Sequence, residues 1–117
     1  MHLAAVRCTP EGTVWICGDK GTLLKGSFNR WEVIEDSACT ENWYDLTLFE
    51  GRVYLAGNTQ LACYDGSNLT TVDTGLNRSF STHRLSASEG ILWSIGEDDI
   101  LRYENGQWQE IIHPDNA

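Results

Sequence analysis

Short apolar runs of four to six residues alternate along the whole chain with clusters of Gly, Asp and Asn. The runs are rich in β-branched and aromatic residues, which favour strands, and no run keeps a helical spacing of apolar positions. The pattern predicts an all-β chain without helices. The expected strands cover residues 3–8, 13–18, 22–27, 31–35, 44–49, 52–57, 61–64, 69–73, 83–87, 91–96, 100–103 and 107–112.

One segment occurs three times without a gap, at residues 11–18, 50–57 and 89–96. Each copy begins with Glu-Gly, ends with Gly, and carries an aromatic residue between them: Trp15, Tyr54 and Trp93 are 39 residues apart. Four strands in about forty residues, repeated, are typical of β-propeller blades. We therefore expect one domain, 1–117, with three four-stranded antiparallel blades at about 1–39, 40–78 and 79–117.

The first unit reads Val-Trp-Ile-Cys-Gly-Asp-Lys-Gly-Thr-Leu-Leu over residues 14–24 and is followed by Trp31. It resembles the Trp-x-x-Gly-x-x-Gly-x-Ile/Leu repeats of photosystem-assembly-factor-like propellers, within the bacterial superfamily related to the WD, kelch and neuraminidase repeats. The other two units keep the aromatic residue and the first glycine only. The resemblance implies a fold and no activity, and neither the sialidase Asp box nor the Trp-Asp ending of WD repeats is present.

The net charge is −9, from 17 acidic and 8 basic residues. This charge disfavours nucleic acids and anionic membranes and suits a basic protein partner. Residues 1–7 lack the charged and apolar regions of a secretory signal, so we expect a cytoplasmic protein. Cys8, Cys17, Cys39 and Cys63 show no zinc spacing and are expected to be reduced, although Cys8 and Cys17 flank one turn and could lie close together.

Candidate binding residues lie where the repeat breaks down. The connections 36–43 and 74–82 differ completely in sequence and should reach the rim of the central channel, together with the turns between second and third strands. Aromatic residues and Arg are enriched at binding hot spots. The candidates are Trp43, Tyr44, Arg78, Phe80 and His83; alternatively, Trp43 and Phe80 cap the blade cores.

Asp45 and Arg84 are 39 residues apart on the expected innermost strands. We expect them to line the channel as a structural ion pair. His83 is the one histidine in a plausible general-base position, but no nucleophile can be placed beside it.

Other conspicuous residues favour structural roles, so we expect no catalytic residue, metal site or cofactor. The glutamates of the three Glu-Gly pairs belong to turns, and the acidic run 97–99 is a solvated turn rather than a calcium site. Trp15, Tyr54 and Trp93, and likewise Trp31, Leu69 and Trp108, share equivalent positions and favour packing between blades over stacking against sugars.

The favoured function is a non-enzymatic protein-binding scaffold of an accessory or immunity type. A lectin-like module and a hydrolase or lyase at the channel mouth remain as alternatives. Three blades leave two outer faces open, while rings usually contain about four to eight blades. We therefore expect a homodimer that closes a six-bladed ring, or a ring completed by a second propeller fragment.

Overall fold

The computed structural model describes residues 3–27, 30–34, 42–57, 60–75, 82–96 and 99–111, and its regular elements are all strands. They form three four-stranded sheets, each antiparallel and ordered as in the sequence. Blade 1 contains β1 (Leu3–Cys8), β2 (Val14–Gly18), β3 (Leu23–Ser27) and β4 (Arg30–Val33). Blade 2 contains β5 (Asp45–Phe49), β6 (Arg52–Ala56), β7 (Leu61–Tyr64) and β8 (Leu69–Thr71). Blade 3 contains β9 (Arg84–Ser88), β10 (Ile91–Ile95), β11 (Ile100–Glu104) and β12 (Gln107–Ile111).

The prediction of an all-β chain with three four-stranded blades is confirmed. Every expected strand is present, with ends that differ by no more than about two residues, a normal uncertainty for strand boundaries. Within the described ranges there is no helix, and so none long and apolar enough to cross a membrane.

The Glu-Gly pairs form the turns between the first and second strands of each blade. Glu50 and Gly51 have φ angles of 51° and 76°, and Glu89 and Gly90 have 53° and 79°. Positive φ at both central residues is the geometry of a two-residue hairpin whose twist matches its strands, and glycine adopts it without strain. The glutamates therefore serve turn geometry, as the sequence indicated.

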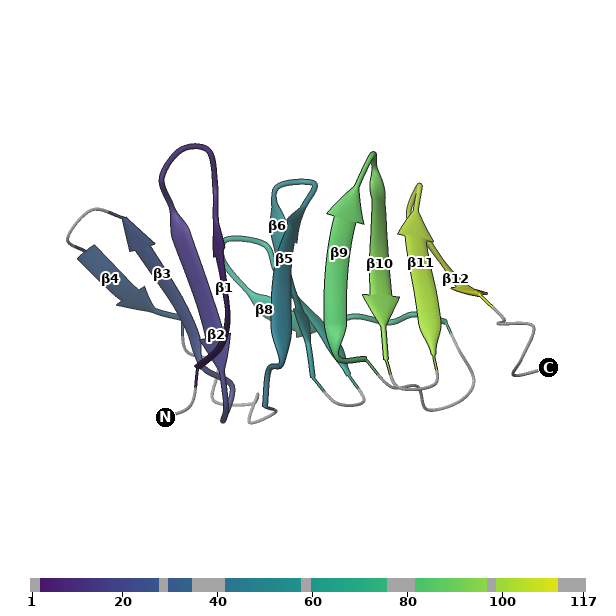
Figure 1. Ribbon diagram of the computed structural model, residues 1–117, viewed down its shortest axis with the longest axis horizontal. Helices are drawn as coiled ribbons and strands as arrows, with labels where there is room; N and C mark the ends of the chain where they lie inside the picture. The colour runs from purple at the N-terminus through teal and green to yellow at the C-terminus, as the bar shows by residue number, and fades with distance from the viewer. Residues whose placement is uncertain are drawn as a thin grey trace.

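The three blades stand side by side in a row, with blades 1 and 3 at its two ends (Figure 1). The first strand of each blade is innermost: β1 contacts β5, and β5 contacts β9. The molecule measures 50 × 29 × 22 Å, so the row is an open arc and not a closed ring.

Two apolar cores lie between the blades. Between blades 1 and 2, Trp15 packs with residues such as Leu46 and Leu55, and between blades 2 and 3, Tyr54 packs with residues such as Leu92 and Leu101. Trp15 is 7% exposed and Tyr54 is 5% exposed. Both rings are therefore packing residues, and the near-equivalent sugar sites of a lectin-like module do not exist at these two positions.

The thiols of Cys8, Cys17 and Cys63 are free, while Cys39 lies outside the described residues. Cys8 pairs with Val14 and Cys17 with Ala5 across the same two strands. Neighbouring positions of a strand point to opposite faces, which places Cys8 and Cys17 on opposite sides of blade 1. The two thiols cannot form a disulfide without rearrangement of the sheet.

Candidate functional site

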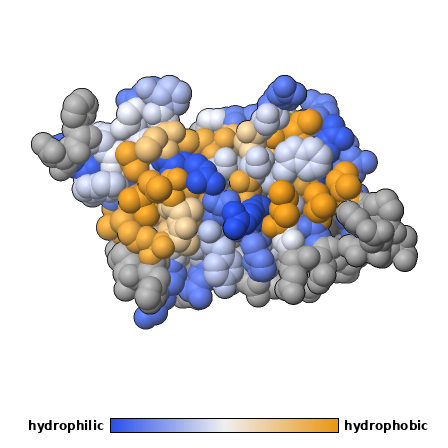
Figure 2. Space-filling view, viewed as in Figure 1, coloured by the Kyte–Doolittle hydropathy of each residue, from blue (hydrophilic) through white to orange (hydrophobic). Residues whose placement is uncertain are grey.

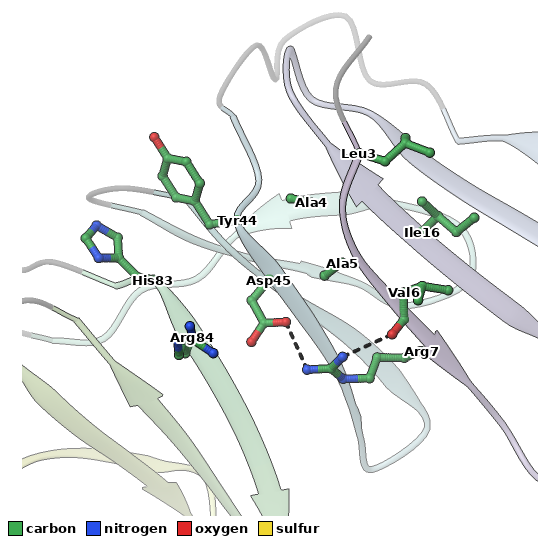
Figure 3. Close-up of a pocket in the computed structure, with 10 residues that line it drawn as sticks. All are labelled: Leu3, Ala4, Ala5, Val6, Arg7, Ile16, Tyr44, Asp45, His83 and Arg84. Atoms are coloured by element: carbon green, nitrogen blue, oxygen red, sulfur yellow. Dashed lines mark hydrogen bonds and ion pairs between the residues drawn. The ribbon is translucent and has the colours of Figure 1, made fainter.

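A pocket of about 1080 Å³ lies where the three innermost strands meet the rim. Figure 3 shows its wall, with side chains from all three blades converging on it. The lining residues are Leu3, Ala4, Ala5, Val6, Arg7, Ile16, Tyr44, Asp45, His83 and Arg84. Apart from Arg7, the wall is apolar on the side of blade 1, and it is polar on the side of blades 2 and 3.

Asp45 is the central polar residue of the pocket and is 7% exposed. Its Oδ1 accepts hydrogen bonds from the N–H of Leu46 at 2.9 Å and from the guanidinium of Arg7 at 3.0 Å. Its Oδ2 accepts a hydrogen bond at 2.8 Å from the N–H of Leu85 on β9. This carboxylate therefore joins the innermost strands of all three blades.

The predicted ion pair between Asp45 and Arg84 is wrong, because the partner of Asp45 is Arg7. Both predicted residues line the pocket, but Arg84 contributes its exposed guanidinium to the wall and forms no ion pair with a residue that the structure describes (Figure 3).

The sequence period misses Arg7 because β1 is displaced by one residue relative to the other innermost strands. Five residues separate the paired Cys8 and Val14, but four separate the equivalent Leu48 and Val53. A β-bulge between Leu3 and Ala5 also shifts the pairing of β1. The longer first hairpin is visible in the sequence as Thr-Pro-Glu-Gly-Thr at residues 9–13. Its length could have indicated the displacement of β1.

Tyr44 and His83 form the upper wall of the pocket (Figure 3). They occupy the same position in successive blades, and their rings meet edge to face with centroids 5.5 Å apart. Tyr44 is 44% exposed and His83 is half-buried. The structure thus brings two of the five predicted binding residues into one accessible aromatic surface.

The other three predicted binding residues do not join this surface. Trp43 is 1% exposed and belongs to the core between blades 1 and 2, so its assignment as a binding residue is wrong and the alternative, that it caps the blade cores, is right. The physical reason is strand alternation: Trp43 continues toward β5 and points inward, while the adjacent Tyr44 points outward. Arg78 and Phe80 lie outside the described residues.

The rim gathers turns and connections, as expected. The N–H of Lys20, between β2 and β3, donates a 2.9 Å hydrogen bond to the Asn42 side chain in the connection to blade 2. The N–H of Trp43 donates to the Gly18 carbonyl at 2.9 Å, and the N–H of His83 donates to the Ile95 carbonyl at 2.9 Å. These bonds fix the backbone just before Tyr44 and Arg84.

The described lining of the pocket offers groups that can contact another molecule. Both oxygens of Asp45 accept hydrogen bonds, and the lining side chains that the structure describes include no Ser, Thr, Cys or Lys. Across the described ranges, no three His, Cys, Asp or Glu side chains group as metal ligands. Arg7, Arg84, Tyr44 and His83 instead offer the aromatic and guanidinium groups common at protein interfaces.

Fold and pocket define an open array of three β-propeller blades with a recessed channel mouth. Solved structures support this fold: YCF48 bound to D1 peptide matches 96% of this chain and 40% of its own, with a TM-score of 0.73 and 13% identity. The extracellular domain of the hybrid two-component system BT4673 of B. thetaiotaomicron matches 98% of this chain and 22% of its own, with a TM-score of 0.56 and 15% identity.

No family model matches the sequence. The chain is, however, 36% identical over 109 residues to the immune protein Tsi7 of Pseudomonas aeruginosa strain PAO1. The alignment covers 93% of this chain and 36% of that protein. The chain therefore spans about a third of the length of this relative.

Proposed function

We propose that the chain is a non-enzymatic, immunity-type module that binds and neutralises a toxic protein through the rim of its channel. The observation that carries this proposal is the 36% identity to the immune protein Tsi7 along 93% of the chain. The Tyr44 and His83 surface above the pocket is an accessible aromatic part of the described rim and supplies the contact. Aromatic residues in such positions bury much area at low entropic cost.

The charge of the chain extends this proposal to the partner. A net charge of −9 steers a basic protein toward the chain and speeds its association at low salt.

The free thiols of Cys8, Cys17 and Cys63 fit a reducing compartment, so we place this binding in the cytoplasm. We also propose that the first unit belongs to the Trp-x-x-Gly-x-x-Gly repeats, on the basis of Trp15, Gly18 and Gly21.

A second copy of the chain, or a second propeller fragment, completes the ring in this proposal. The open arc contains three blades, and six is the multiple of three within the usual range of about four to eight. In a two-fold homodimer, blade 3 of each copy packs against blade 1 of the other. The pocket then becomes part of a shared channel.

A photo-crosslinking amino acid at position 44 tests the binding site in the source cell, with the same amino acid at position 50 as the control. Tyr44 and Glu50 are both exposed and lie at opposite ends of β5. We expect position 44, and not position 50, to capture one protein that is toxic in cells lacking this chain. Equal capture from both positions, or capture of no such protein, would contradict the proposal.

A further inference from the structure

Each blade has two unlike faces. The leading face, as we call it, carries the aromatic residue of the second strand, which is Trp15, Tyr54 or Trp93. The trailing face is the opposite one and carries the third-strand position occupied by Tyr64 in blade 2 and Tyr103 in blade 3. Antiparallel partners share a face, so the strand pairing fixes this assignment for every blade.

Both interfaces within the chain join a leading face to a trailing face. Trp15 of blade 1 meets Tyr64 of blade 2 edge to face, with ring centroids 5.9 Å apart. Tyr54 of blade 2 meets Tyr103 of blade 3 at 6.3 Å. Aromatic residues at equivalent positions thus meet at both interfaces.

Among the described residues, one face of each kind has no blade packed against it. The leading face of blade 3 presents Trp93, with the Arg102 guanidinium 5.8 Å from its ring, and Ile95, which is 43% exposed. Arg102 repeats the arrangement of Lys25, whose ammonium lies 5.4 Å from the Trp15 ring inside the first interface. The open side of blade 3 therefore carries a cation over a tryptophan ring, as the side of blade 1 that meets blade 2 does.

The trailing face of blade 1 is apolar and uncovered. Val6, Trp31 and Val33 are 53%, 57% and 58% exposed. Figure 2 shows apolar surface over blade 1, at the left, and also toward blade 3, at the right. Soluble proteins seldom expose such side chains together without a partner for them.

Trp31 supplies the aromatic group that this face otherwise lacks. Gly26 stands where blades 2 and 3 have Tyr64 and Tyr103. A Cβ atom on Gly26 would lie 2.5 Å from the Trp31 ring, so the ring covers the empty position. Blade 1 therefore presents the Trp31 ring at the position where the aromatic residue of a docked leading face would contact it.

We infer that the leading face of blade 3 docks on the trailing face of blade 1 of a second copy, with Trp93 against Trp31 and Ile95 against Val6. This inference rests on the proposed ring closure and assigns its contact. The occupant is a second copy because one chain carries both halves of the contact, and two copies bury all four open faces in one closed pair. The contact continues the two interfaces that the chain already makes.

Sedimentation equilibrium tests this with Trp31→Ala and Trp93→Ala, and with Tyr44→Ala as a control on the rim. We expect the native chain at twice its mass of 13.1 kDa. Each tryptophan variant should raise the dissociation constant about a hundredfold or more, as for an interface hot spot. The control should leave it unchanged. Cooperative thermal unfolding of each variant shows that the blades themselves remain folded.

A mixture of the two tryptophan variants gives the sharpest result. In the mixed pair one junction regains both native rings, so the mixture should associate more tightly than either variant alone. Three results would overturn the inference: a stable native particle at 13.1 kDa, a native particle that contains a different protein, or association that depends on Trp31 and not on Trp93. None of these results bears on toxin capture at position 44, so the two proposals can fail separately.

Discussion

Replacement of Asp45 by Ala is expected to destabilise the junction of the three innermost strands. Hydrogen bonds to a charged group contribute about 1.5–3 kcal/mol each, and the variant loses those to the N–H groups of Leu46 and Leu85. Arg7 adds less than about 1 kcal/mol, because its side chain is 44% exposed and its ion pair is screened by solvent. We expect a loss of about 2–4 kcal/mol in the free energy of unfolding, since water can replace part of what is removed.

Urea denaturation followed by tryptophan fluorescence measures this loss at one protein concentration. With a slope of about 2 kcal/mol per molar urea, the middle of the range for small proteins, the midpoint should fall by about 1–2 M. Asp45→Asn keeps one acceptor oxygen, so its urea midpoint should lie between those of Asp45→Ala and the native chain. Arg7→Ala should cost less than about 1 kcal/mol. An Arg7→Ala loss as large as that of Asp45→Ala, or an unchanged midpoint in Asp45→Ala, would refute this role of Asp45.

Three further outcomes follow from the same structure. Burial raises the pKa of the Cys17 thiol to about 12, so a thiol reagent at pH 8 should label the exposed Cys8 and reach Cys17 only after unfolding, which mass spectrometry can check. Burial likewise raises the pKa of Tyr54 from 10.0 to about 12; a group with a raised folded-state pKa stabilises the fold fully below its unfolded pKa. Stability should therefore fall between about pH 10 and 12, and less so in Tyr54→Phe, as thermal melting across this range would show. Gly26→Val should push the Trp31 ring out of its place. The dissociation constant of the dimer in sedimentation should rise, while the melting temperature should change little.

The fold could be predicted from the sequence because one physical unit occurs three times. Turn residues such as Gly51 and Gly90 recur at the same step as Tyr54 and Trp93, so local turn preference and core packing indicate the same blade. The repeat also placed Trp31, Leu69 and Trp108 at one position, and each pairs with the equivalent residue of the third strand.

The candidate site could be predicted only in part, because it lies where the repeat is broken. Arg7 pairs with Trp15 on the face of blade 1 that meets blade 2, and it reaches Asp45. Arg84 pairs with Ile95 on the face of blade 3 that points away from blade 2. Trp43 and Tyr44 are adjacent and similar in type, but strand alternation buries one and exposes the other. A period of 39 residues carries no information on either point, since both depend on the local register of a single strand.

Protection of cells tests the central claim most directly. The protein captured from position 44 would be expressed together with the native chain, with Tyr44→Ala/His83→Ala, or with Glu50→Ala, and viable cells would be counted. We expect survival with the native chain and Glu50→Ala and loss of survival with the double variant, because that variant lacks the exposed aromatic pair above the pocket. Equal survival with all three chains would contradict the central claim.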